Sequence, residues 1–329
     1  MRHRPDTDLH LIVPSSSFLR CPRGYPLESS NVTAPDQTPL SHPAGKRRVG
    51  IGLPVFNGEK FLEESIRSIV EQTFEDFELV IGDNASTDAT EEICRSFERD
   101  PRVTYVRRER NLGATPNYND LMSRLEAPLV RWQACDDAIA PEYLGACVAM
   151  LDEDQGASMA HAHARVIDGT GGDIGGWDQE SALEADAPVD RWEAMAVAPD
   201  WHSIFGLVRR EVLDAVGLFP IYPGSDRWVL GGWLLHGHVR LVEEPLFIWR
   251  DHAETFRRTA NQSKSDAENW WSTDLKSWPL RTTVLGCRHG RRVIGTSPLN
   301  RKERKACRRL LHRQVASPAV RKARGLIRI

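Results

Sequence analysis

Short apolar segments of strand length alternate with amphipathic helical segments from Arg48 onward, and this alternation constrains the fold more than any other feature. The runs VGIGLPVF (49–56) and FELVIGD (77–83) have the length and composition of buried strands. Between them, residues 59–72 place their apolar side chains on one helical stripe. Strands that alternate with helices predict a mostly parallel sheet with helices on both faces.

The same order continues along the chain. Pro54 and the turn pair Asn57-Gly58 are predicted to end the first strand. Asp88 and Glu91 can form a capping box for a helix over residues 89–99. A third strand is expected over 103–106, a third helix over 116–125 and a fourth strand over 128–134.

The second half of the chain is less regular. A helix is expected over 143–151, a strand over 159–168, a glycine-rich turn over 169–176, and a strand and helix over 204–217. A further helix begins at Asp226 and ends near Gly237, with Gly231-Gly232 expected to interrupt it. His161 and His163 alternate with alanines, but no further ligand stands nearby, so a half-covered strand is favoured over a metal pair.

Polar residues follow three of the predicted strands, at the point where each strand ends. They are Asn57, Asp83 and the pair Asp136-Asp137. Ligands of open parallel sheets lie at the carboxyl ends of the strands. Two adjacent carboxylates repel each other unless a cation or hydrogen-bond donors hold them. Alone, the pair would be taken for a helix cap before Pro141, but together with the other two positions it predicts a binding site.

Composition excludes several classes of protein. The net charge of −3 argues against a nucleic-acid-binding chain, and no window of this sequence has the roughly 18 consecutive apolar residues of a membrane span. The 6 cysteines form no C-x-x-C pair, and the first residues lack the apolar core of a secretory signal. A cytoplasmic chain with reduced thiols is expected.

Three regions are expected along the chain. Residues 1–47 form a disordered leader rich in Pro, Ser and Thr, and residues 48–255 form the folded domain, with halves at 48–140 and 141–255. Residues 256–329 form a basic, helical extension, in which 301–329 carry eleven Lys and Arg against the single Glu303. This extension is either a solvated helix face or a peripheral contact with the anionic inner surface of the cell membrane.

Several motifs resemble one family in order and spacing. The stretch from PVFNGEKFLEES to IGDNASTD, followed by NLGATPNYN, WQACDD, FGLVRREVL, GSD and EEPLFIWRDH, resembles the bacterial family-two glycosyltransferases. The resemblance implies the GT-A fold, a Rossmann-like α/β architecture, a nucleotide-sugar donor, bound Mn²⁺ or Mg²⁺ and inversion at the anomeric carbon. A hard divalent cation would stabilise the charge on the departing diphosphate.

The resemblance also implies roles for single residues. Asp137 matches the metal ligand and Asp136 the ribose contact of the family, and His252 matches a third metal or phosphate contact of some relatives. The loop that surrounds the nucleotide base is matched by Pro54, Phe56 and Asn57, with Phe56 in place of a frequent Tyr, and Asp83 matches the acid that binds the base. Arg107, Arg108 and Arg110 lie where one of them could reach the phosphates, and Arg110 is the candidate we adopt.

The catalytic base implied by the resemblance is Asp226, which opens a helix after a short loop. Ser225 stands where relatives often have Glu, and Asp226 could equally be a helix cap. Trp201 and Trp228 are weaker candidates for stacking on an acceptor sugar. The expected activity is therefore an inverting, metal-dependent transfer of a hexose-like sugar from a UDP-, dTDP- or GDP-sugar to a hydroxyl acceptor, as in surface polysaccharide synthesis.

Two other functions are compatible with parts of the sequence. A sugar nucleotidyltransferase is disfavoured, because GLPVFNG stands where that class has a G-x-G-T-R loop. A catalytically degenerate protein that binds sugar nucleotides as the partner of another transferase stays open, with Ser225 and the two helix glycines as its support.

Overall fold

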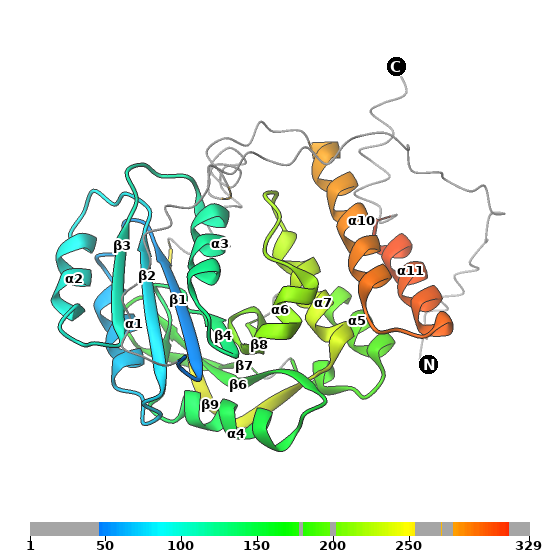
Figure 1. The fold of residues 1–329 in the computed structure, drawn as a ribbon, viewed down its shortest axis with the longest axis horizontal. Helices are drawn as coiled ribbons and strands as arrows, with labels where there is room; N and C mark the ends of the chain where they lie inside the picture. Colours follow the sequence, from blue (N-terminus) through cyan, green and yellow to red (C-terminus); the bar gives the residue numbers. More distant parts are fainter. Residues whose placement is uncertain (1–45, 178–179, 198–201, 254–270, 272–278, 316–329) are drawn as a thin grey trace, which may run out of the picture. The chain divides into compact units, whose positions relative to one another are not determined.

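The computed structural model describes residues 46–177, 180–197, 202–253, 271 and 279–315 (Figure 1). The strands are β1 (Val49–Val55), β2 (Phe77–Asp83), β3 (Val103–Arg107), β4 (Leu129–Trp132), β5 (Ala138–Ile139), β6 (Ala157–Asp168), β7 (Asp173–Trp177), β8 (Leu207–Arg209) and β9 (His238–Asp251). The helices are α1 (Leu62–Val70), α2 (Thr90–Phe97), α3 (Ala114–Arg124), α4 (Tyr143–Glu153), α5 (Pro188–Val197), α6 (Arg210–Val216), α7 (Ser225–His236), α10 (Pro279–Thr296) and α11 (Arg301–Val315), with short 3-10 turns at Ser181–Glu184 and Ser203–Phe205.

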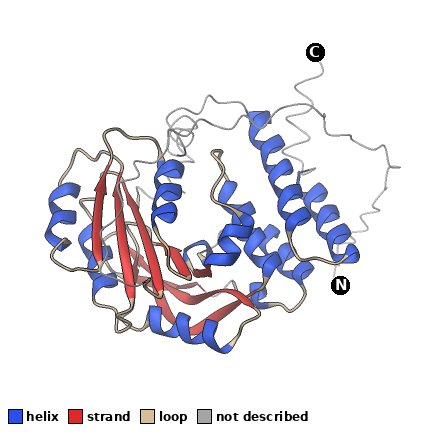
Figure 2. Cartoon of the chain, in the orientation of Figure 1, coloured by secondary structure: helices blue, strands red, loops and turns tan. Residues whose placement is uncertain are grey.

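One mixed sheet connects both halves of the predicted domain, in the order β3-β2-β1-β4-β8-β6-β9-β5 with β7 beside β6 (Figure 2). The strands β1 to β4 are parallel, and their register places Val55 opposite Asp83. Strands β8, β5 and β7 pair antiparallel with their neighbours, whereas β6 and β9 are parallel. The predicted α/β class is therefore confirmed, with four neighbouring parallel strands, β1 to β4, in the N-terminal half.

Helices cover both faces of the parallel strands, so β1 and β2 are buried along their whole length. On one face, α3 approaches closely because Gly52 and Gly82 have no side chains. A Cβ atom at Gly52 would lie 2.7 Å from Met122 Cε, and one at Gly82 would lie 2.7 Å from Asn117 Oδ1. The close approach of α3 brings its N-terminal half to the carboxyl ends of the strands, where the candidate site lies.

The helices α5, α7, α10 and α11 pack together beside the C-terminal half of the sheet. Trp192 of α5 and Trp233 of α7 are fully buried in their common core. None of the helices in the described part of the chain is both long and apolar enough to cross a membrane.

Some local predictions are wrong. Pro54 does not end the first strand, because it lies within β1, opposite Gly82. The capping box of Asp88 and Glu91 does not form: Asp88 accepts from the backbone of Thr90, whereas Glu91 pairs with Arg95. Residues 173–176, expected in a turn, begin strand β7.

The pair Gly231-Gly232 does not interrupt α7, which runs unbroken to His236. A Cβ atom at Gly232 would lie 2.5 Å from Val216 Cγ1, and one at Gly231 would lie 2.8 Å from Met195 Cε. The two glycines are therefore needed where α6 and α5 press against α7, and the cost of glycine in a helix is offset by close packing.

Candidate functional site

The predicted aspartate pair lies in the tight turn between β4 and β5, at the carboxyl end of the parallel strands. Asp137 is 4% exposed, and its Oδ1 atom accepts a hydrogen bond of 2.9 Å from the backbone N–H of Arg250 on β9. Burial and the neighbouring charge of Asp136 raise the pKa of Asp137 well above its usual value, against the lowering effect of Arg250 and Arg131. A buried carboxylate of this kind is stabilised when it gains a positive partner.

Arg250 fixes this turn from β9, the strand that pairs with β5. Its Nε donates to the carbonyl oxygen of Asp136 at 3.0 Å, and its guanidinium pairs with Glu64 on α1. The same guanidinium lies 4.6 Å from the ring centroid of Phe61. Arg250 is 3% exposed and therefore connects α1, β9 and the aspartate turn within the protein interior.

The side chain of Asp136 faces the end of β9. Its Oδ2 atom lies 3.0 Å from Nε2 of His252, and 29% of the Asp136 side chain is exposed. The His252 ring is 4.7 Å from the ring of Phe61, measured between centroids. The structure thus brings the three predicted ligands and contacts, Asp136, Asp137 and His252, to one place.

Asp226 begins the first turn of α7, as predicted, directly after Gly224 in the left-handed conformation and the buried Ser225. Burial raises the pKa of Asp226, whereas the backbone N–H and the charge of Arg227 lower it. A carboxylate that binds protons more strongly than usual is suited to act as a general base.

Tyr118 of α3 shares the surroundings of Asp226 and of the aspartate pair. Burial raises the pKa of its hydroxyl, and the acidic groups of Cys135, Asp136, Asp137 and Asp226 raise it further. These four groups lie on two segments, residues 135–137 and Asp226, and the fold brings both close enough to affect the charge of Tyr118 on α3. Sequence reasoning missed Tyr118, although it stands inside the quoted NLGATPNYN motif.

The neighbouring residues of that motif hold the surrounding loops. Asn119 donates to the carbonyl oxygen of Phe219 at 2.8 Å and accepts from the N–H of Phe219 at 3.0 Å. This pair of bonds ties α3 to the loop that leads into Asp226. Asn117 donates to the carbonyl oxygen of Gly82 at 2.6 Å, beside the end of β2.

The loop after β1 is joined to the loop after β2. Asn57 has a left-handed backbone, with φ of 52°, and its Oδ1 accepts from the N–H of Thr87 at 2.9 Å. Its own N–H donates to Ser86 Oγ, also at 2.9 Å. Phe56 is 46% exposed next to these contacts, whereas Pro54 is buried in β1. Of the three predicted base-loop residues, Phe56 is the one that presents an apolar ring to a ligand.

Asp83 lies at the end of β2, as predicted, but it is fully buried and already hydrogen-bonded. Its Oδ2 accepts from Tyr105 and from Arg107, each at 2.7 Å, and its Oδ1 accepts from the N–H of Ser86 at 2.8 Å. A carboxylate has about four lone-pair positions, so three are engaged, and because Asp83 is fully buried a base could reach it only where Tyr105 or Arg107 moves aside.

The three candidate arginines after β3 differ in their partners. Arg107 pairs with Asp83, and Arg108 pairs with Asp120 at 2.9 Å. Arg110 is exposed and makes no hydrogen bond or ion pair with another described residue. It is thus the one of the three whose charge is uncompensated.

The donor set at the aspartate pair is that of a hard divalent cation, with carboxylate oxygens and one imidazole nitrogen. No group of three or more His, Cys, Asp or Glu side chains converges as a metal site within the described ranges. Mg²⁺ and Mn²⁺ often bind through one or two protein groups and complete their shell with phosphate oxygens. The residues therefore fit a cation held jointly with a diphosphate, provided that His252 exchanges its contact with Asp136 for the ion.

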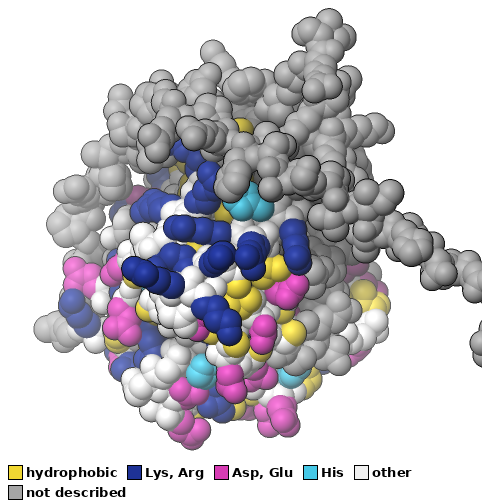
Figure 3. Space-filling view, turned by 90° about the vertical axis from the view of Figure 1, so that its right-hand side faces the viewer, with side chains coloured by type: hydrophobic (Ala, Val, Ile, Leu, Met, Phe, Trp, Pro, Cys, Tyr) yellow, Lys and Arg dark blue, Asp and Glu magenta, His cyan; other side chains and the backbone are white. Residues whose placement is uncertain are grey.

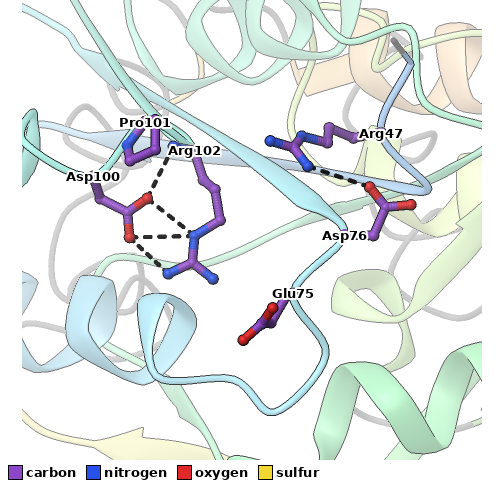
Figure 4. Close-up of a pocket in the computed structure, with 6 residues that line it drawn as sticks. All are labelled: Arg47, Glu75, Asp76, Asp100, Pro101 and Arg102. Atoms are coloured by element: carbon purple, nitrogen blue, oxygen red, sulfur yellow. Dashed lines mark hydrogen bonds and ion pairs between the residues drawn. The ribbon is translucent and has the colours of Figure 1, made fainter. Parts of the chain in front are cut away.

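A hollow lies at the opposite end of the parallel strands, where they begin (Figure 4). It is lined by Arg47, Glu75, Asp76, Asp100, Pro101 and Arg102. Its charges are compensated within the protein, since Arg47 lies 3.6 Å from Asp76 and Arg102 lies 2.6 Å from Asp100. This hollow therefore lacks the unpaired donors that a diphosphate needs.

The remaining candidates fall outside the site. Trp228 is 8% exposed and packs in the core, where a Cβ atom at Gly290 would lie 2.9 Å from its ring. It cannot stack on an acceptor sugar, and Trp201 lies outside the described residues. His161 is buried and bonds to the hydroxyl of Tyr143 at 2.8 Å, in agreement with a structural role.

Comparison with known proteins identifies the chemistry of this domain. Residues 51–214 match the model of the family described as glycosyl transferase family 2. Glycosyltransferase GlyA of Streptococcus pneumoniae is 33% identical over 30% of this chain and 14% of its own length. The putative glycosyltransferase EpsE of Bacillus subtilis is 29% identical over 38% of this chain and 42% of its own length. These first relatives are thus matched over less than half of their length.

A longer match is the uncharacterized glycosyltransferase alr2836 of Nostoc, which is 25% identical over 67% of this chain and 70% of that protein. Among solved structures, residues 1–349 of S. aureus TarS with UDP-GlcNAc align with a TM-score of 0.64 and 17% identity. The alignment covers 86% of this chain and 76% of that one, and it shows a common fold. Residues 51–214 of this chain belong to the family 2 glycosyltransferases.

Proposed function

We propose that the protein is an inverting, metal-dependent enzyme that moves a hexose-like sugar from a nucleotide-sugar donor to a hydroxyl acceptor. The observation that carries the proposal is the turn at the carboxyl end of β4, where Asp136 Oδ2 lies 3.0 Å from His252 Nε2 and Asp137 Oδ1 accepts from the backbone N–H of Arg250. The known complexes of TarS with UDP and with UDP-GlcNAc support a uridine donor for a protein of this fold, and dTDP- and GDP-sugars are alternatives. Surface polysaccharide or glycoconjugate synthesis would supply such an acceptor.

In the proposed reaction, the acceptor oxygen bonds to the anomeric carbon while the bond from that carbon to the diphosphate oxygen breaks. Asp226 receives the proton of the acceptor hydroxyl, and its raised pKa makes that transfer more favourable. Mn²⁺ or Mg²⁺, bound by Asp137 and His252 together with the diphosphate, would neutralise the charge on the leaving group. Asp136 would accept a hydrogen bond from the ribose, and Arg110 would approach the phosphates.

The base of the donor would lie against the joined loops after β1 and β2. Phe56 offers its exposed ring for packing on the base, and Asn57 fixes the loop that carries it. Asp83 would accept from the base once Tyr105 or Arg107 turns away, since its oxygens are otherwise engaged.

The alternative of a degenerate binding partner loses its main physical support. That reading depended on an interrupted α7, but the helix is continuous and its glycines are explained by the packing of Val216 and Met195. Ser225 is fully buried, so it replaces a Glu of relatives without presenting a second carboxylate to the substrate.

Nucleotide release from UDP-, dTDP- and GDP-sugars, with Mn²⁺ and with a chelator, tests the proposal. We expect metal-dependent release that falls by about 100-fold or more in Asp137→Ala. Asp76→Ala is the matched control, because Asp76 is an exposed carboxylate at the opposite edge of the strands, and its release should equal that of the wild type. Equal release by Asp137→Ala and the wild type would overturn the metal assignment, and binding of donor without any turnover would favour the degenerate partner.

A further inference from the structure

The surface of α11 carries a continuous stripe of positive charge. The helix has the sequence RKERKACRRLLHRQV, with seven Lys and Arg residues against the single Glu303. Arg301, Lys305, Arg308 and His312 recur at helical spacing and line one hollow together with Arg304 and Arg309. Over eleven steps of about 1.5 Å, the stripe from Arg301 to His312 extends for roughly 17 Å.

The side of α11 opposite the stripe packs against the rest of the protein, so the stripe points outward. Cys307 and Leu311 are fully buried, and α11 packs against α10 and α5. Figure 3 shows the resulting gathering of Lys and Arg side chains on this face of the molecule. The packing of its buried side prevents α11 from rotating about its axis, so the stripe faces solvent.

The charge of the stripe is not compensated within the described part of the protein. Glu303 caps its own helix by accepting from the N–H of Asn300 at 2.8 Å. Arg301, Lys305, Arg308 and Arg309 make no ion pair with a described carboxylate. A row of like charges costs free energy of repulsion, and an anionic partner would remove that cost.

We propose that this cationic face docks the protein on an anionic lipid surface. The exposed large hydrophobic residues of the described chain are Phe56, Ile174 and Val284, and none lies on α11, so the face lacks the apolar centre of a protein interface. Helix α11 has no Phe, Tyr or Trp that could stack on unpaired bases. A plane of lipid phosphates matches an extended row of cations, and each Lys or Arg near such a surface strengthens binding about fivefold.

The inference rests on the proposed function only for its purpose, because a transferase held at a membrane would meet acceptors that are carried by lipids. Docking itself depends on charge alone, and it is measured without any donor. The two proposals can therefore fail separately.

The test is co-sedimentation of the full chain with vesicles of phosphatidylcholine alone and of equal parts phosphatidylcholine and phosphatidylglycerol. We expect binding only to the anionic vesicles, and loss of that binding as salt shortens the Debye length from about 10 Å to about 3 Å. Lys305→Glu/Arg309→Glu should weaken it by at least about tenfold. The control Arg99→Glu/Arg165→Glu reverses two exposed charges outside α11 and should bind within about twofold of the wild type.

Three outcomes would overturn the inference. They are equal binding to both kinds of vesicle, unchanged binding by the α11 variant, and tighter binding to a single-stranded oligonucleotide than to the anionic vesicles. Thermal melting of both variants checks that they fold. Nucleotide release in solution should be the same for the α11 variant and the wild type. If neither protein releases nucleotide, the proposed function is contradicted, whereas the docking proposal is still decided by the vesicle experiment.

Discussion

The backbone N–H of Arg250 donates to Asp137 Oδ1 at 2.9 Å, so the end of β9 holds the carboxylate that follows β4. The side chain of Arg250 secures the same turn through the carbonyl oxygen of Asp136 and anchors it to Glu64 on α1. The position of the proposed metal ligand thus depends on a buried residue that is not itself a predicted ligand.

Arg250→Ala should lower nucleotide release by about tenfold or more, because the Asp136-Asp137 turn loses its side-chain anchor. Loss of a buried, hydrogen-bonded charge should also destabilise the fold by about 3 kcal/mol. Arg250→Lys should restore little, since an ammonium lacks the planar fork that bonds Asp136 and Glu64 together. The Mn²⁺ concentration for half-maximal release should rise in both variants.

The control for Arg250 is Glu64→Gln, which removes the charge of a half-exposed partner. Its release should stay within about threefold of the wild type, since the Gln amide oxygen can still accept from Arg250 at this half-exposed position and Arg250 keeps its bond to Asp136. If Arg250→Ala melts at a lower temperature but keeps the metal dependence of the wild type, the residue is structural and does not position the turn.

Asp226→Asn should abolish sugar transfer and leave donor binding intact, since the amide cannot accept the acceptor proton. In the wild type, the rate of transfer should fall as the pH falls through the raised pKa of Asp226. Isothermal titration with donor, beside transfer measured over a pH series, checks both statements. Loss of donor binding in the variant would assign Asp226 a structural role.

The same substitution should also change stability with a defined sign. Burial raises the pKa of Asp226 above its unfolded value, so folding favours the neutral carboxyl group. Its contribution to stability is full below the unfolded pKa and is lost as the pH rises through the folded pKa. Asp226→Asn resembles the neutral form and should melt at or above the wild-type temperature at pH 8, with the difference shrinking toward pH 4.

Asn119→Ala should loosen the loop that leads into Asp226, because both hydrogen bonds to Phe219 are lost. We expect a loss of about 1–3 kcal/mol of stability and a fall in kcat that exceeds the change in the KM for donor. Ser123→Ala on the same helix removes an exposed hydroxyl that donates only to the carbonyl oxygen of Asp120 in its own helix, and it serves as the control. A variant with reduced donor affinity and unchanged kcat would contradict this role for Asn119.

Gly232→Ala should destabilise the protein despite the better helix propensity of Ala. The new methyl group would meet Val216 at 2.5 Å, and overpacking of this kind costs about 1–3 kcal/mol. Gly295→Ala in α10 is the matched control, because nothing lies within 4 Å of its Cβ position, and it should stabilise by about 0.5–1 kcal/mol.

Combination of Gly232→Ala with Val216→Ala tests the cause of this effect. Removal of the two clashing methyl groups should make the double variant lose less stability than the sum of the single variants. Chemical denaturation of the four proteins measures the free energies of unfolding. Strict additivity would show that Val216 is not the source of the strain.

The sequence predicted the parallel half of the sheet well, because each strand there is an apolar run and each helix has one apolar stripe. Asn57, Asp83 and Asp136-Asp137 lie together at the carboxyl ends of the strands, as that topology predicts. The strands β6 and β9 pair over a long distance in the chain, and β8 and β5 are two or three residues long, so their order in the sheet is set by tertiary contacts that no local pattern reports.

The contacts within the site were less accessible to sequence reasoning. Gly232 was expected to break a helix, since propensity cannot report that Val216 will press against it. Asp83 was expected to face a ligand, but two of its three internal donors, Tyr105 and Arg107, come from β3, whose approach depends on the folded chain. Arg250 stands two positions before His252, a spacing that could have marked it as a neighbour of the aspartates.

The loops after β1 and β2 interlock through Asn57, Ser86, Thr87 and the bond from the N–H of Gly58 to Thr90. A change of the proposed nucleobase specificity would therefore require both loops to be replaced together. If one loop alone were replaced, it would lack the hydrogen bonds from the other loop that fix its conformation.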